Sequence, residues 1–86
     1  MRYLAEFYRA QGGTDLDEVA AAARAAAKQI SRDNRDVRLL TAIYAGADES
    51  CFMLYQADSA DLVTAAGERA GIAFDRVVEV TTSEPG

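Results

Sequence analysis

The sequence predicts an α+β domain in which strand, helix, strand, strand, helix and strand follow one another. Short runs of aliphatic and aromatic residues indicate the strands, alanine-rich runs with helical spacing indicate the helices, and turn residues separate them. A chain of 86 residues has the length of one domain. We assign residues 1–82 to this domain and residues 83–86 to a C-terminal tail.

A strand and a long helix are predicted at the start of the chain. Residues 3–9 are rich in aromatic and aliphatic side chains, and Gly12-Gly13 ends this run. Thr14 is suited to cap the helix that follows, because acidic residues fill the next turn, where the helix dipole favours negative charge. Apolar side chains then recur at helical spacing, which predicts a helix over residues 15–30.

The middle of the chain predicts a β-hairpin. Residues 37–45 and 50–57 are strand-like runs, and residues 46–49 join them with the length and composition of a hairpin turn. The charged residues 31–36 indicate a solvated loop before the first of these strands, and this loop has no phosphate-binding glycine pattern.

A second helix and a fourth strand are predicted after the hairpin. Asp58 or Ser59 can cap this helix, and Gly71 stands where helices commonly end in a left-handed residue. Phe74 is expected to cover the end of the helix. Residues 76–82 then have the composition of a strand.

This order of elements is that of the ferredoxin-like fold, βαββαβ. Two right-handed split β-α-β units place the first and third strands at the centre of a four-stranded antiparallel sheet and the other two at its edges. Both helices then cover one face of the sheet. The other face has no cover from this chain.

Strand alternation divides the sheet residues between the two faces. The helix-covered face is predicted to contain Ala5, Phe7, Leu39, Ile43, Phe52, Leu54, Val78 and Val80. The uncovered face is predicted to contain Leu4, Glu6, Tyr8, Arg38, Leu40, Ala42, Tyr44, Cys51, Met53, Tyr55, Val77, Glu79 and Thr81. Because monomers rarely expose so large an apolar patch, we expect a homodimer of the dimeric α+β barrel type, with a cleft between the two sheets.

The polar and aromatic side chains of the uncovered face form the predicted ligand site: Glu6, Tyr8, Arg38, Tyr44, Met53, Tyr55 and Glu79. Glu6 and Glu79 are expected to lie close together, where a proton, a cation or Arg38 would have to compensate their charge, unless both face water at the rim of the dimer. The tyrosines can donate hydrogen bonds to a ligand or can pack at the interface. Cys51 and Met53 alone make a poor transition-metal site, and burial explains Cys51 more simply.

Composition excludes several classes of function. A net charge of −5 disfavours nucleic acid and anionic membranes as partners. The sequence has no membrane-spanning run and no signal peptide at its start, and its single cysteine fits a reducing compartment, so we expect a cytoplasmic protein. It contains no histidine, which removes the usual general base and the commonest transition-metal ligand, and with them Ser-His and Cys-His catalysis.

Three short runs carry a family resemblance. They are YLAE at residues 3–6, CFMLYQA at residues 51–57 and AGIAFDRV at residues 70–77. Together they resemble a family of small bacterial ferredoxin-like domains of unknown function that includes described nickel-binding proteins. The resemblance implies the same fold, a dimer, and in some members nickel held by histidines and neighbouring oxygen ligands. This chain has no histidine to inherit that role, so Glu6 is the polar position that carries over.

We therefore expect a small non-catalytic binding or accessory protein, a homodimer whose cleft holds a small ligand or a weakly bound cation. No cofactor is expected, with a divalent metal such as nickel as the alternative. A second hypothesis is a cofactor-free isomerase, cyclase or oxygenase in which Glu6 or Glu79 carries a proton and a tyrosine orients the substrate. A third is a module whose uncovered face binds a different protein.

Overall fold

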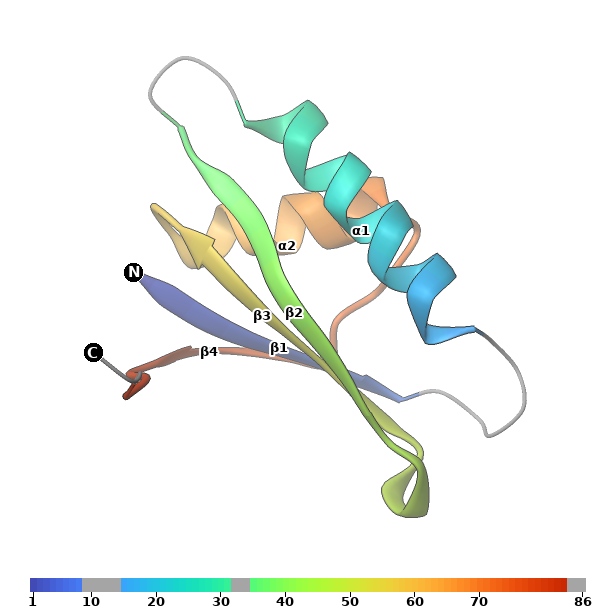
Figure 1. Cartoon of the computed structure of the whole chain (residues 1–86). Helices are drawn as coiled ribbons and strands as arrows, with labels where there is room; N and C mark the ends of the chain where they lie inside the picture. Colours follow the sequence, from blue (N-terminus) through green and yellow to red (C-terminus); the bar gives the residue numbers. More distant parts are fainter. Residues whose placement is uncertain (9–14, 32–34, 84–86) are drawn as a thin grey trace.

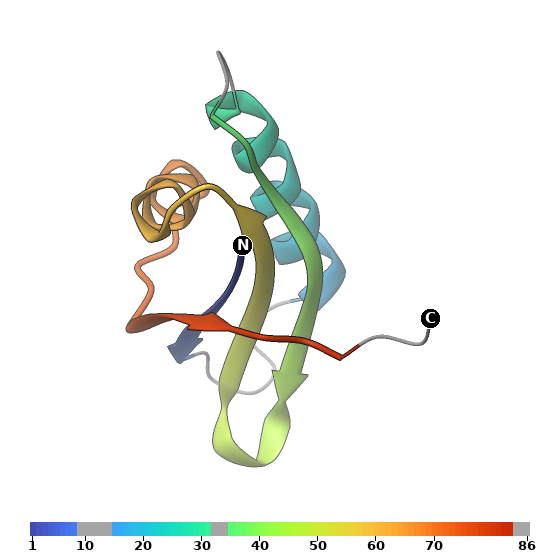
Figure 2. The same cartoon turned by 90° about the vertical axis from the view of Figure 1, so that its left-hand side faces the viewer.

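A four-stranded antiparallel sheet carries two helices on one of its faces (Figure 1). This computed structural model describes residues 1–8, 15–31 and 35–83. The elements follow the predicted βαββαβ order, so the α+β, ferredoxin-like fold is confirmed. The sheet is strongly twisted, and β4 crosses the direction of β2 (Figure 2).

The two central strands are β1 (Arg2–Tyr8) and β3 (Ser50–Ala57), which pair with each other. The edge strand β2 (Val37–Ala45) pairs with β3, and the edge strand β4 (Arg76–Val80) pairs with β1. The resulting order, β2-β3-β1-β4, is the one predicted. Strand β4 is two residues shorter than the predicted 76–82, and the prediction for Arg9 lies outside the described residues.

Helix α1 (Leu16–Ile30) begins directly after Asp15, whose carboxylate accepts a hydrogen bond from the Asp17 amide at 2.9 Å. Asp15 is therefore the N-cap; Thr14, the predicted cap, lies outside the described residues. The buried side of α1 is formed mainly by alanines, because a small side chain lets a helix lie close to a sheet. They are Ala20, Ala23, Ala26 and Ala27, joined by Val19.

Helix α2 (Ala60–Arg69) begins at Ser59, whose hydroxyl oxygen accepts a hydrogen bond from the Leu62 amide. Of the two predicted caps, Ser59 is thus the one used, and Asp58 instead accepts a hydrogen bond from the Asp36 amide at 2.8 Å. Gly71 follows the helix with a φ of 79°, which confirms the predicted left-handed end.

The connection between β2 and β3 is a single 3₁₀ turn, η1 (Gly46–Asp48), followed by Glu49 in the left-handed conformation. The predicted hairpin turn over residues 46–49 is confirmed. Phe74 packs beneath α2, with its ring 5.9 Å from that of Phe7 and 6.1 Å from that of Tyr55, as expected of a side chain that covers the end of this helix.

The two faces of the sheet follow from the strand register, because residues directly opposite each other share a face. The helix-covered face contains Tyr3, Ala5, Phe7, Val37, Leu39, Ala42, Tyr44, Cys51, Met53, Tyr55, Ala57, Val77 and Glu79. The other face, which we call the open face, contains Arg2, Leu4, Glu6, Tyr8, Arg38, Thr41, Ile43, Ala45, Ser50, Phe52, Leu54, Gln56, Arg76, Val78 and Val80.

The predicted division of side chains was right for β1 and for the start of β2, and wrong elsewhere. Five side chains predicted beneath the helices lie on the open face: Ile43, Phe52, Leu54, Val78 and Val80. Seven predicted on the uncovered face lie on the helix-covered face: Ala42, Tyr44, Cys51, Met53, Tyr55, Val77 and Glu79. One cause is an irregularity in β2 between Leu39 and Thr41, which includes Leu40 and reverses the alternation beyond it.

Candidate functional site

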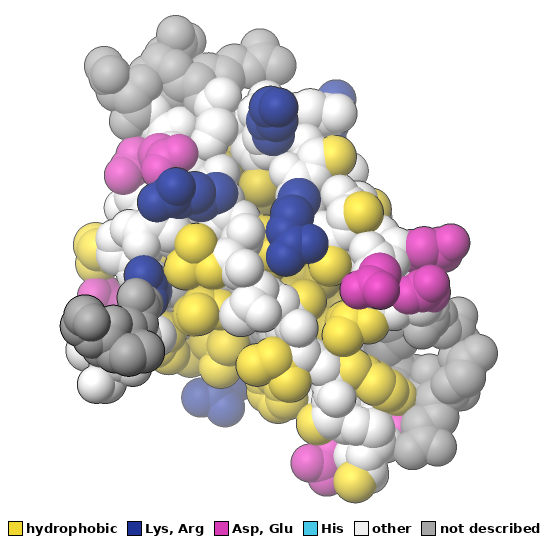
Figure 3. All heavy atoms as spheres, in the orientation of Figure 1, with side chains coloured by type: hydrophobic (Ala, Val, Ile, Leu, Met, Phe, Trp, Pro, Cys, Tyr) yellow, Lys and Arg dark blue, Asp and Glu magenta, His cyan; other side chains and the backbone are white. Residues whose placement is uncertain are grey.

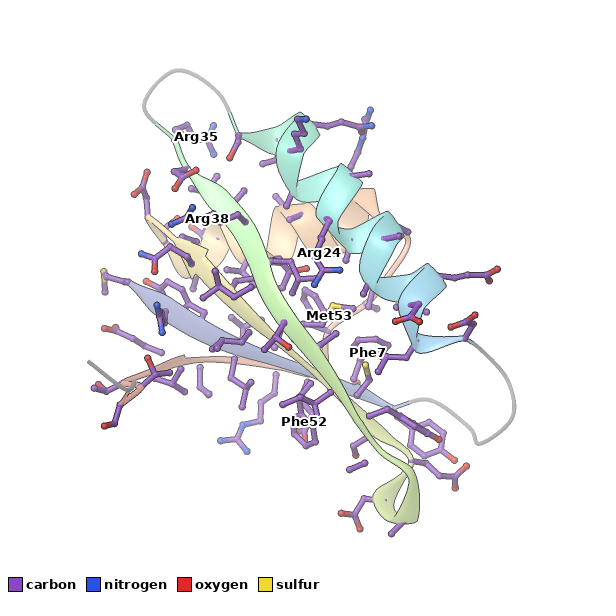
Figure 4. All side chains as sticks on the ribbon, in the orientation of Figure 1. Phe7, Arg24, Arg35, Arg38, Phe52 and Met53 are labelled. Carbon is purple, nitrogen blue, oxygen red and sulfur yellow. The ribbon has the colours of Figure 1, made fainter. Side chains whose placement is uncertain are left out.

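The open face is an apolar surface that the helices leave uncovered. Phe52 lies on the side of the sheet away from α1, whereas Phe7 and Met53 point toward the helices (Figure 4). Ile43 is 54% exposed, and Leu4, Phe52, Leu54 and Val78 are only partly buried. The face is therefore apolar and accessible to water at the same time.

A hollow of about 90 Å³ lies on this face and is lined by Leu4, Glu6, Phe52, Arg76 and Val78. The register explains the grouping: Glu6 stands opposite Arg76 on one neighbouring strand and opposite Phe52 on the other. An acid and a base thus line the hollow from neighbouring strands, together with apolar side chains. Such a hollow suits a small molecule with an apolar body and a polar end, and it is smaller than most ligand pockets.

Tyr8 lies at one end of the open face and is 63% exposed. Its hydroxyl donates a hydrogen bond to Glu49 Oε1 at 3.1 Å, and its backbone N–H donates one to Asp75 Oδ2 at 3.1 Å. The hydrogen bond to Glu49 and the charge of that carboxylate raise the pKa of Tyr8 above its usual value. Tyr8 therefore remains a protonated phenol near neutral pH.

The prediction placed Tyr44, Met53, Tyr55 and Glu79 in the ligand site, and the structure places all four on the other face of the sheet. Met53 and Tyr55 are 0% exposed, and the Tyr55 hydroxyl contacts Met53 Sδ at 3.8 Å. Burial raises the pKa of Tyr55 to about 12. Tyr44 is half-buried against the core. None of the four lines the hollow, and Met53, Tyr55 and Tyr44 belong to the core or pack against it.

The predicted Glu6–Glu79 pair is wrong. Glu79 stands opposite Tyr3 on the helix-covered face, whereas Glu6 is on the open face. Arg38 shares the open face but stands opposite Gln56, toward the other end of the sheet from Glu6. Arg76, which is not among the predicted site residues, stands opposite Glu6 on β4. The two carboxylates therefore lie on opposite faces of the sheet.

Nickel does not fit the side chains that the described residues offer. The sequence contains no histidine. Within residues 1–8, 15–31 and 35–83, no three Cys, Asp or Glu side chains come together as a metal site. Cys51 is buried on the helix-covered face, and Glu6 stands beside the positive charge of Arg76, which disfavours a cation there.

A ferredoxin-like domain with an apolar, uncovered sheet face and a small mixed hollow defines a class of small binding modules. The chain belongs to the SCO4226-like family, described as nickel responsive protein SCO4226-like, whose model matches residues 3–80. The resemblance inferred from the three short runs is thus confirmed, and membership indicates a small accessory or binding protein.

A solved structure supports the same assignment of fold. The crystal structure of SCO4226 from Streptomyces coelicolor A3(2) is similar to this chain with a TM-score of 0.76 and 24% sequence identity, over 98% of this chain and 100% of that one. No curated protein matches the chain. Among the described residues, neither helix has the length and hydrophobicity needed to traverse a bilayer.

Proposed function

We propose that this chain is a non-catalytic binding or accessory protein that works as a homodimer. In the proposed dimer the open faces of two copies pack against each other and enclose a cleft for a small, partly apolar ligand. The observation that carries the proposal is the row of apolar side chains left partly exposed on the open face, including Ile43 at 54%.

The size of the chain supports a dimer. A domain of this length buries only about 60–65% of the surface that its unfolded chain exposes, so covering a further apolar face contributes substantially to stability. Two identical faces can meet around a two-fold axis, which is the commonest symmetry of protein dimers. A facing copy would also close the open side of the 90 Å³ hollow.

The lining of the hollow supports a ligand that is neither a metal ion nor fully apolar. Arg76 can bind a carboxylate or carbonyl oxygen, Glu6 can accept a hydrogen bond from an amine or hydroxyl, and Leu4, Phe52 and Val78 can pack around an aliphatic or aromatic body.

We place the dimer in the cytoplasm, since reducing conditions would keep the buried Cys51 as a thiol.

Thermal unfolding in a panel of small aromatic and aliphatic carboxylic acids, amines and amino acids tests this function. At a concentration about ten times its Kd, a ligand should stabilise the folded chain by about 1.4 kcal/mol and raise Tm by roughly 6–11 °C. The rise should disappear in Arg76→Gln and persist in Arg69→Gln, whose exposed side chain belongs to α2. Failure of every compound, or an equal rise in both variants, would refute the proposed cleft.

A further inference from the structure

A second hollow, of about 360 Å³, lies between α1 and the outer edge of β2, away from the hollow at Glu6. Arg24 and Lys28 line it from α1, where their spacing of four residues places them on one side of the helix, and Arg38 lines it from β2. Lysine and arginine side chains gather over this part of the surface (Figure 3), around the positions labelled Arg24, Arg35 and Arg38 in Figure 4.

The floor of this hollow is apolar and fixed. Val37 and Leu39 form it and are both buried. Ser31 ties the end of α1 to β2, because its Oγ donates a hydrogen bond to the Val37 carbonyl and accepts one from the Val37 amide, each at 2.9 Å. The end of α1 and the start of β2 are therefore held together beside the hollow.

The charge of the hollow is positive, although the chain as a whole carries −5. The lining contains three cationic residues, of which Arg38 sits on the edge strand with its side chain on the open face, and one carboxylate, that of Asp36, which lies 3.4 Å from Ser31 Oγ. Throughout the part of the chain that the structure describes, the side chains of Arg24, Lys28 and Arg38 have no hydrogen-bond or ion-pair partner. By contrast, Arg69 donates a hydrogen bond to Gln29 Oε1 at 2.8 Å.

We propose that this hollow binds a small polyanion that carries two or more phosphate or carboxylate groups. Arginine guanidinium groups bind such oxygens in a two-pronged geometry, and lysine adds a compact charge. The volume lies within the range of small-molecule sites. Lys28 also stands in the last turn of α1, where it offsets the helix dipole, but that role does not require Arg24 or Arg38 beside it. This hollow shares no lining residue with the one at Glu6, although Arg38 also belongs to the open face.

Isothermal titration calorimetry of the full chain at low ionic strength, with inorganic pyrophosphate and citrate as probes, tests this site. At least one probe should bind once per chain with a Kd below about 1 mM and lose affinity as salt is added. The double variant Arg24→Gln/Arg38→Gln should weaken binding at least about tenfold, because it removes the charge-assisted hydrogen bonds. Arg69→Gln is the control, since it removes one charge from α2 and should leave the affinity unchanged.

Three results would overturn the proposal. The first is the absence of binding by both probes at millimolar concentration. The second is equal affinity in the double variant and the Arg69→Gln control, with circular dichroism showing that both are folded. The third is binding of the chain to phosphatidylglycerol vesicles that is not inhibited by pyrophosphate or by citrate. This result would identify a membrane surface, and not a small anion, as the ligand.

Discussion

Replacing Gly67 with alanine should destabilise the chain, although the same change in most helices is stabilising. Gly67 lies in the buried side of α2, and a Cβ built on it would stand 2.8 Å from Cδ2 and 2.9 Å from Cζ of Phe74. These distances are too short for non-bonded carbon atoms, so the Phe74 ring must move. Its displacement would disturb the ring contacts to Phe7 and Tyr55.

The magnitude follows from two opposing effects. Alanine is favoured over glycine inside a helix by about 1 kcal/mol. Overpacking costs about 1–3 kcal/mol, and each aromatic pair that is disturbed adds about 0.5–1.5 kcal/mol. We expect Gly67→Ala to lower the free energy of unfolding by about 1–2 kcal/mol and therefore to lower Tm by roughly 4–16 °C.

Urea and thermal unfolding, followed by circular dichroism at one fixed protein concentration, measure this effect. The cycle comprises the wild type, Gly67→Ala, Phe74→Ala and the double variant. With the Phe74 ring removed, Gly67→Ala should become stabilising by up to about 1 kcal/mol, because only the helix preference remains. A stabilising Gly67→Ala in the wild-type background, or the same loss in both backgrounds, would refute the reasoning.

Three further outcomes are expected. Tyr55 has a pKa of about 12 in the folded chain and about 10 when unfolded, so the unfolded state loses its proton first and stability falls as pH rises from 10 to 12. Between pH 10 and 12 the free energy of unfolding, measured by urea titration, should fall by about 2–3 kcal/mol more in the wild type than in Tyr55→Phe. Parallel pH profiles of the two proteins would contradict this. Gly71→Ala should lower the free energy of unfolding by about 1 kcal/mol, because an alanine is strained at a φ of 79°. This loss should add to that of Phe74→Ala, and a strong coupling between the two changes would argue against backbone strain as the cause. Addition of about 100 µM Ni²⁺ should leave Tm within about 1 °C, since the chain has no histidine, and a saturable rise with Ni²⁺ but not with Mg²⁺ would contradict that expectation.

Much of the fold could be predicted because local signals were unambiguous. The bounds of β2 and β3 were predicted to the residue, since a turn separates them and charged or capping residues flank them. The order of the strands followed from the right-handed connections of the two β-α-β units. The end of α2 was marked by Gly71, which has no Cβ to oppose a positive φ.

The faces of the sheet could not be predicted in the same way, because β3 is apolar on both sides. Met53 and Tyr55 are no more hydrophobic than Phe52 and Leu54, so the alternation along β3 does not indicate which pair faces the helices. The irregularity at Leu40 has no glycine or proline to mark it. Of the predicted site residues, Glu6, Tyr8 and Arg38 therefore reach the open face, and the other four do not.

The partner of Glu6 was missed for the same reason. Its identity depends on the register between β1 and β4, which sets Arg76 opposite Glu6 and Glu79 opposite Tyr3. A reversed phase for β4 exchanges these neighbours and turns an acid–base pair into a pair of acids. The alternation of the strand was correctly recognised, but its phase depends on contacts with residues more than 60 positions away in the chain.

Sedimentation equilibrium tests most directly whether a second copy covers the open face. At about 10 µM, the wild type should sediment with twice the 9.2 kDa mass of the chain. Ile43→Lys places a charge on an exposed position of the open face and should give the single-chain mass, whereas Ala22→Lys, on the exposed side of α1, should remain a dimer. A wild type with the mass of one chain, or an Ile43→Lys variant that stays dimeric, would contradict the proposed interface.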